Sequence, residues 1–61
     1  MITIREKNGL YRMVLISRGR EYDLHPADSP ATFATPHGAT ARALSIAKDI
    51  GTSYIPMKRN T

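Results

Sequence analysis

Residues 8–19 read NGLYRMVLISRG, a stretch rich in β-forming residues with a turn signal at each end. Asn8-Gly9 is a strong signal for a two-residue hairpin, because both positions tolerate positive φ, and Arg18-Gly19 is a weaker one. Residues 10–17, between the two signals, favour a strand. The flanking segments 2–6 and 20–24 alternate apolar and polar side chains, but in opposite phase. The sequence therefore predicts three strands in a meander.

The two turns together predict the register of this sheet. The first turn places Ile4 opposite Met13. The second turn places Leu15 opposite Tyr22. One face of the sheet then collects the apolar side chains Ile2, Ile4, Tyr11, Met13, Leu15, Tyr22 and Leu24. Because a slip of one residue would scatter this set over both faces, the pattern supports the register.

A helix is expected after a loop that contains Pro26 and Pro30. Thr35 is a suitable N-cap, and a proline fits the helical position that follows it. At helical spacing, one stripe carries Ala39, Ala43, Ile46, Ala47 and Ile50. Gly51 suits the left-handed position that ends a helix. The sequence therefore predicts an α+β fold (βββα), in which one helix packs on one face of a three-stranded antiparallel meander.

Residues 1–57 are expected to form a single small domain, and residues 58–61 a frayed basic tail. Residues 52–56 are expected to add a short strand at an edge of the sheet, where Pro56 is tolerated. The chain has no cysteine, so neither a disulfide nor a thiolate metal site supplements its core. The longest apolar run, residues 13–16, is far too short to span a membrane. We therefore expect a cytoplasmic protein that does not enter the membrane.

The charged residues give little support for catalysis, because none of the acidic residues has the spacing of a catalytic pair. Asp23 and His25, with Asp28 nearby, are the residues that suggest a metal site. An exposed histidine beside a charge is the more ordinary interpretation. A chain of 61 residues also leaves little room for a cleft that excludes water. We expect a non-enzymatic protein without cofactor, metal or small-molecule substrate.

The face of the sheet that the helix leaves uncovered, here called the open face, carries residues that point to a partner. Arg5 and Arg12 are expected to be cross-strand neighbours, and like charges in such positions favour an anionic ligand. The net charge of +4 agrees with a polyanion partner. The nucleic-acid site predicted from these features consists of Arg5, Lys7, Arg12, Arg18 and Arg20. Glu21 and Asp23 also lie on the open face. Asp23 is diagonal to Arg12 and can neutralise the positive charge of Arg12.

The open face also permits two other interpretations. Val14 and Ile16 on the middle strand, with Met1 beside them, form a small apolar patch that suits a protein partner or a second copy of the chain. Alternatively, the face is an ordinary solvated one, since small antiparallel domains leave some apolar atoms exposed. The sequence leaves nucleic-acid binding, protein interaction or self-association, and a plain surface as alternatives.

Three strands followed by the pattern Phe33-x-Thr35-x-x-x-Ala39-x-x-x-Ala43 resemble the AP2-like DNA-binding domains, including the arm-binding domains of phage integrases. The resemblance covers Leu10 to Ile50. It implies a helix packed behind the sheet and a sheet that enters the major groove of DNA. The reading residues that it implies are Arg5, Arg12, Arg18 and Arg20. Glu21 and Asp23 depart from the family, which favours basic or neutral residues on the third strand.

Overall fold

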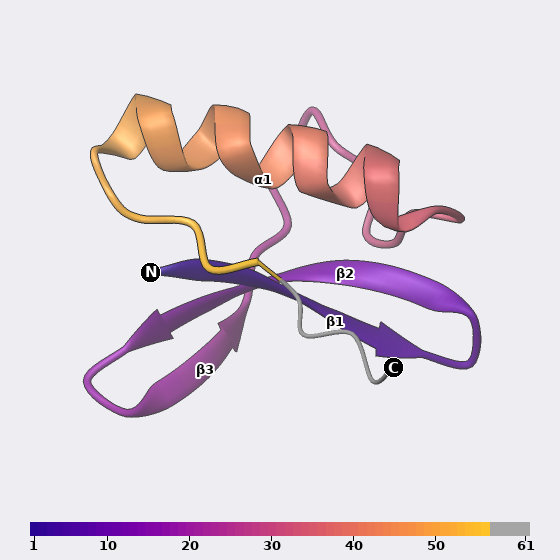
Figure 1. Cartoon of the computed structure of the whole chain (residues 1–61), viewed down its shortest axis with the longest axis horizontal. Coiled ribbons are helices and arrows are strands. Elements are labelled where there is room, and N and C mark those ends of the chain that lie inside the picture. Colours follow the sequence, from indigo (N-terminus) through magenta and orange to yellow (C-terminus); the bar gives the residue numbers. More distant parts are fainter. Residues whose placement is uncertain (57–61) are drawn as a thin grey trace.

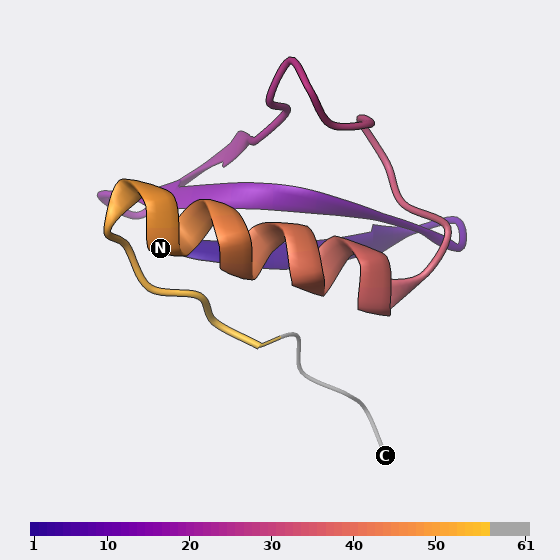
Figure 2. The same ribbon diagram turned by 90° about the horizontal axis from the view of Figure 1, so that it is seen from above.

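The computed structural model describes residues 1–56, and its N-terminal half folds into three strands. These are β1 (Ile2–Lys7), β2 (Leu10–Ser17) and β3 (Arg20–Asp23), and the helix α1 (Pro36–Ile50) follows them. The strands form one antiparallel sheet in the order β1-β2-β3, and α1 lies across one face of it (Figures 1 and 2). The predicted βββα fold is confirmed. The tail expected at residues 58–61 lies outside the described residues.

Two tight turns fix the register of the sheet. Asn8 and Gly9 have φ angles of 56° and 78°, and Arg18 and Gly19 have φ angles of 53° and 76°. Positive φ at both central residues is typical of the type I′ turn, whose twist matches that of the strands it joins. The cross-strand partners, from Ile2 opposite Leu15 to Ser17 opposite Arg20, are those predicted from the sequence.

The helix begins and ends at the predicted residues. The Thr35 side chain accepts a hydrogen bond from the Gly38 N–H at 3.2 Å, and Gly51 ends the helix with a φ of 73°. The core lies between α1 and the first two strands and consists of Ile2, Ile4, Met13, Ala39, Ala43, Ile46 and Ala47. Because the helix contributes mainly alanines to this core, its backbone can approach the sheet closely.

Two residues expected in the core are largely exposed. Ile50 is 58% exposed and Tyr22 is 50% exposed. The last turn of α1, which carries Ile50, extends past the start of β1 (Figures 1 and 2). The helix packs on β1 and β2 and makes no contact with β3, so nothing from α1 covers Tyr22. Helical spacing predicted the correct face but not where the sheet beneath it ends.

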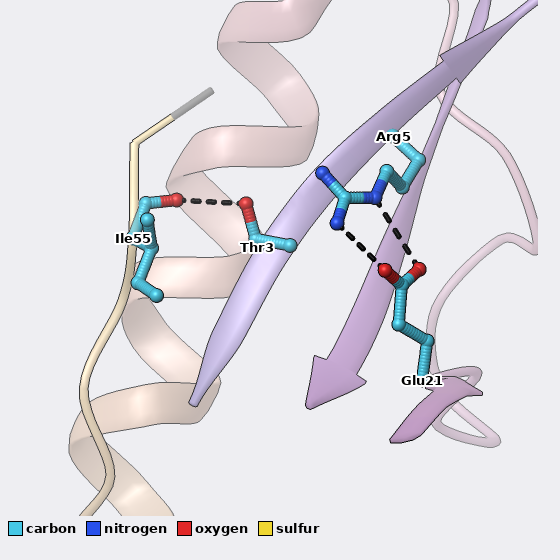
Figure 3. Close-up of polar contacts among 4 residues, drawn as sticks. All are labelled: Thr3, Arg5, Glu21 and Ile55. Atoms are coloured by element: carbon cyan, nitrogen blue, oxygen red, sulfur yellow. Dashed lines mark hydrogen bonds and ion pairs between the residues drawn. The ribbon is translucent and has the colours of Figure 1, made fainter. Parts of the chain in front are cut away.

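The C-terminal segment lies beside β1 instead of forming a fourth strand. A single parallel bridge joins Ile2 and Tyr54. The Ile2 N–H donates to the Ser53 carbonyl, and the Ile55 N–H donates to the Ile2 carbonyl, each at 2.8 Å. The Thr3 hydroxyl adds a bond of 2.9 Å to the Ile55 carbonyl (Figure 3). Within residues 1–56, the expected edge strand is thus reduced to one bridge on β1.

At the other edge of the sheet, Phe33 occupies the part of β2 that β3 leaves free. The Phe33 N–H donates to the Tyr11 carbonyl at 2.7 Å, and the Tyr11 N–H donates to the Phe33 carbonyl at 2.9 Å. Phe33 also packs against the core, as expected for a residue that closes its edge. Within residues 1–56, no helix combines the length and the apolar character needed to cross a membrane.

Candidate functional site

Two ion pairs join the basic and acidic residues of the open face. Arg5 on β1 donates its Nε and Nη2 to the two carboxylate oxygens of Glu21 on β3, at 3.3 and 2.7 Å (Figure 3). Arg12 on β2 donates its Nη1 to Oδ1 of Asp23 at 2.8 Å. Arg5 and Arg12 are cross-strand neighbours, as predicted. Their mutual repulsion is relieved within the chain, because each arginine is paired with an acid on β3.

The Arg5–Glu21 ion pair crosses over the middle strand. Arg5 lies opposite Arg12 and Glu21 lies opposite Ile16, and the residue midway between these two positions on β2 is Val14. Val14 is only 1% exposed, although it lies on the face away from the helix. The charged side chains therefore cover the centre of the open face.

The apolar patch expected on the open face is smaller than predicted. Val14 is buried, Ile16 is partly buried and Met1 is 48% exposed. The cross-strand partner of Val14, Thr3, is also buried, and its hydroxyl is used by the Ile55 carbonyl. A partner that docks on this face would meet Met1 and part of Ile16, but it would not reach Val14.

The Arg5–Glu21 contact shifts the pKa of both groups. It lowers the pKa of the Glu21 carboxyl, chiefly because the hydrogen bonds from Arg5 stabilise its ionised form, and it raises the pKa of Arg5 for the same reason. Both side chains remain about half exposed. An anion from solution therefore competes with Glu21 for Arg5 without entering the core.

The other predicted cations lie at the two ends of the sheet. Arg18 and Arg20 belong to the turn between β2 and β3 (Arg18-Gly19-Arg20, here called the arginine turn), and Lys7 lies next to the turn between β1 and β2. At about 3.3 Å per residue, the eight residues of β2 separate these ends by roughly 25 Å. In the part of the chain that the structure describes, Arg18, Arg20 and Lys7 form no ion pair. The structure thus brings Lys7, Arg5 and Arg12 to one part of the open face and leaves Arg18 and Arg20 apart from them.

Arg20 also lies on the other side of the sheet from Arg5. It is the cross-strand partner of Ser17 and, by strand alternation, shares its side with Tyr22, whereas Glu21 faces the open side. Both Arg18 and Arg20 are exposed. The predicted cations consequently do not form one continuous surface on the open face.

The residues that suggested a metal site have other partners. The His25 Nε2 lies 3.0 Å from the Ser29 carbonyl oxygen, and Asp28 accepts a hydrogen bond of 2.7 Å from Arg42. Among the described residues, no three potential ligands of the His, Cys, Asp or Glu type gather at one place. Arg42, which also donates to the Ser29 hydroxyl, was not singled out from the sequence. The feature of the sequence that could have indicated Arg42 is its position as an arginine among the small residues of the helix.

Comparison of the chain with protein-family models, with curated proteins and with solved structures found no match. The resemblance in shape to the AP2-like domains stays a prediction. What this protein binds therefore has to be inferred from its own residues.

Proposed function

We propose that this protein binds nucleic acid, with the arginine turn as its first contact to phosphate and the ion-paired arginines of the open face as its second. The observation that carries the proposal is the backbone of Arg18, whose φ of 53° lies in the left-handed region. Side chains other than glycine, asparagine and aspartate cost roughly 1–2 kcal/mol in this region. An exposed arginine there is a destabilising choice for the fold, which favours a role in binding.

The first turn of the sheet provides an internal comparison. Asn8 and Gly9 adopt the same backbone as Arg18 and Gly19, with φ angles within a few degrees of theirs. Asparagine is the favoured residue at this position of a type I′ turn. Folding alone therefore does not require an arginine at position 18. The second turn has two exposed arginines around its glycine, and the first has none.

The chemistry of the arginine turn suits phosphate. A guanidinium group donates several hydrogen bonds in a planar array that matches phosphate oxygens. Arg18 and Arg20 lie at the end of a hairpin whose second strand has no contact with the helix, and neither forms an ion pair with another described residue. A phosphate backbone can approach them without displacing any carboxylate. Arg5 and Arg12 are engaged only when phosphate competes successfully with Glu21 and Asp23.

The alternative proposal, a protein interface or a dimer through the open face, is weakened by the burial of Val14. Met1 and Ile16 remain as its apolar contacts. Sedimentation equilibrium tests it directly. A dimer that the substitution Ile16→Lys dissociates would favour this alternative over nucleic-acid binding.

The proposal is tested by fluorescence anisotropy with a labelled random-sequence duplex over a range of salt concentrations. The slope of log K against log salt reports how many phosphates are neutralised. We expect Arg18→Asn and Arg20→Gln each to lower this slope by about one unit and to weaken binding at every salt concentration. Lys48→Gln, which removes the same charge from an exposed position of α1, is the matched control and should leave the slope unchanged.

Two outcomes would contradict the proposal. One is an absence of binding by the native protein at low salt. The other is an equal loss of slope in the arginine variants and in Lys48→Gln, which would indicate attraction by net charge without a specific contact.

A further inference from the structure

The edge of β2 is interrupted where the chain leaves the sheet and returns to it. The Leu24 N–H donates to the Met13 carbonyl at 3.0 Å, and the next contact with this edge is made by Phe33. The intervening segment arches away from the sheet before it reaches α1 (Figure 2). Between the arch and β2 lies a hollow of about 210 Å³, with Met13 and Leu24 among its apolar lining.

A second hollow, of about 250 Å³, lies beside the first at the turn between β1 and β2. Its lining includes Lys7, Asn8 and Leu10. Both hollows are lined by Arg12 and Thr32, which therefore stand at the boundary between them. The two together form a single two-part depression along one end of the sheet.

The loop that contributes part of the lining of the first hollow is bonded to the helix and within itself. Arg42 of α1 donates to the carboxylate of Asp28 and to the hydroxyl of Ser29, and the His25 ring bonds the Ser29 carbonyl. Prolines at positions 26 and 30 further restrict this segment. These bonds tie the middle of the loop, at Asp28 and Ser29, to α1. The lining residues that the loop contributes, His25, Ala31 and Thr32, lie on either side of this point.

The chemistry of the two hollows differs. Around the first, the Asp23 carboxylate accepts hydrogen bonds, Arg12 donates them, and the Thr32 hydroxyl does both. Around the second, Lys7 and Arg12 supply two positive charges. Arg12 uses one Nη1 contact for Asp23, and its side chain is 44% exposed, so its remaining N–H groups can reach a ligand.

We propose that the depression holds one nucleotide of a single-stranded nucleic acid, with the base in the first hollow and its phosphate in the second. The first hollow is smaller than the roughly 300–1,000 Å³ of sites for whole small-molecule ligands, and its lining of apolar side chains together with donors and acceptors suits one flat ring with a polar edge. A base in a duplex is stacked and paired and cannot enter such a hollow, whereas a single strand presents its bases freely. This inference rests on the proposed function and specifies its ligand.

The inference is tested by ¹⁵N-HSQC titration at low salt with three probes: oligothymidylate, a duplex of equal length and thymidine monophosphate. With oligothymidylate we expect shifts at Met13, His25, Ala31 and Thr32 in addition to the arginine turn, Arg5 and Arg12. With the duplex we expect shifts at the arginine turn, Arg5 and Arg12, but at none of these four residues. Because only the single strand can bury a base, it should bind about tenfold more tightly than the duplex.

The matched variants are Ala31→Leu, which fills the first hollow from an exposed loop position without a change of charge, and Ala41→Leu, which makes the same substitution at an exposed position of α1. We expect Ala31→Leu to abolish the preference for the single strand and leave duplex binding unchanged. Ala41→Leu should retain both the preference for the single strand and the binding of the duplex. The native dispersion of the spectra verifies that each variant is folded.

Four results would overturn the inference. If oligothymidylate shifts only the residues that the duplex also shifts, or if Ala31→Leu keeps the single-strand preference, the hollow does not hold a base, while the proposed phosphate contact stands. If thymidine monophosphate binds as tightly as the oligomer, the site takes a free nucleotide and not a strand. If neither polymer binds at low salt, the proposed function fails as well.

Discussion

Arg18 and Asn8 occupy equivalent positions in two turns of the same type, with φ angles of 53° and 56°. Asparagine accepts the left-handed backbone more readily than arginine does. We therefore expect Arg18→Asn to raise the free energy of unfolding by ~1 kcal/mol, a value at the lower end of the left-handed penalty. Urea denaturation measures this change.

The reciprocal substitution is the control for that expectation. Asn8→Arg places an arginine in the same backbone at the other turn, so it should lower the free energy of unfolding by a similar ~1 kcal/mol. Should Arg18→Asn leave stability unchanged, the arginine would cost nothing in this turn, and the argument from strain to binding would lose its basis.

Val14 is a buried residue on a face where burial was not expected. Removing its two methyl groups in Val14→Ala should destabilise the protein by about 1–2 kcal/mol, from ~0.8 kcal/mol per buried carbon and the cavity that is left. Leu10→Ala, at an exposed position of the same face, should change stability by less than about 0.5 kcal/mol. Equal effects in a denaturant titration would mean that the charged side chains do not cover Val14 in solution.

At the scale of the elements, and within residues 1–56, β3 is joined to the other elements only through the sheet. It has four residues, all exposed, and no contact with α1. Besides its ladder with β2, the side-chain bonds that hold it are the pairs from Arg5 to Glu21 and from Arg12 to Asp23. The position of this strand, and with it that of the arginine turn, therefore depends on exposed charges.

This dependence makes the stability of the protein sensitive to acid. The folded pKa of Glu21 lies below its ordinary value of 4.5, so the ion pair stabilises the fold above that pH and the contribution is lost as the pH falls through the folded pKa. We expect Glu21→Gln to reduce the loss of stability below about pH 4.5, as followed by urea denaturation at several pH values. Arg5→Gln should have the same effect. If either variant retained the native pH dependence, the ion pair would not form in solution.

The elements themselves were largely predictable, because each is specified by local chemistry. Asn8-Gly9 and Thr35-Pro36 fixed the register and the start of the helix, and both predictions are confirmed. The exposure of Ile50 depends on how far the sheet extends beneath the helix. The burial of Val14 depends on the length of the Arg5 side chain and on its partner Glu21, which lies two strands away from Arg5. Local patterns contain neither piece of information.

The candidate site was less predictable for a related reason. Charge counting identified Arg5 and Arg12 as available cations, and the sequence placed Asp23 within reach of Arg12. The pairing of Arg5 with Glu21 joins the two outer strands, so it appears only when the sheet is assembled. The anchoring of the loop by Arg42 likewise requires the helix to be in place.

At the scale of the whole molecule, the small size of the core limits what the fold tolerates. A domain of about this length has a net stability of only ~3–5 kcal/mol. Its core pairs a few large strand residues with helix alanines, of which Ala39 and Ala43 are fully buried. The distance between helix and sheet is therefore set by the methyl side chains of these alanines, which are too small to rearrange around a larger group.

This packing leads to a final expectation for Ala43→Leu. Leucine and alanine have similar helix propensities, so the substitution tests packing alone. Three added carbons between helix and sheet should destabilise the protein by about 1–3 kcal/mol, a large share of its total stability. Ala41→Leu, on the exposed side of the same helix, should change stability by less than about 0.5 kcal/mol. Equal urea midpoints for the two variants would place α1 further from the sheet than its buried alanines require.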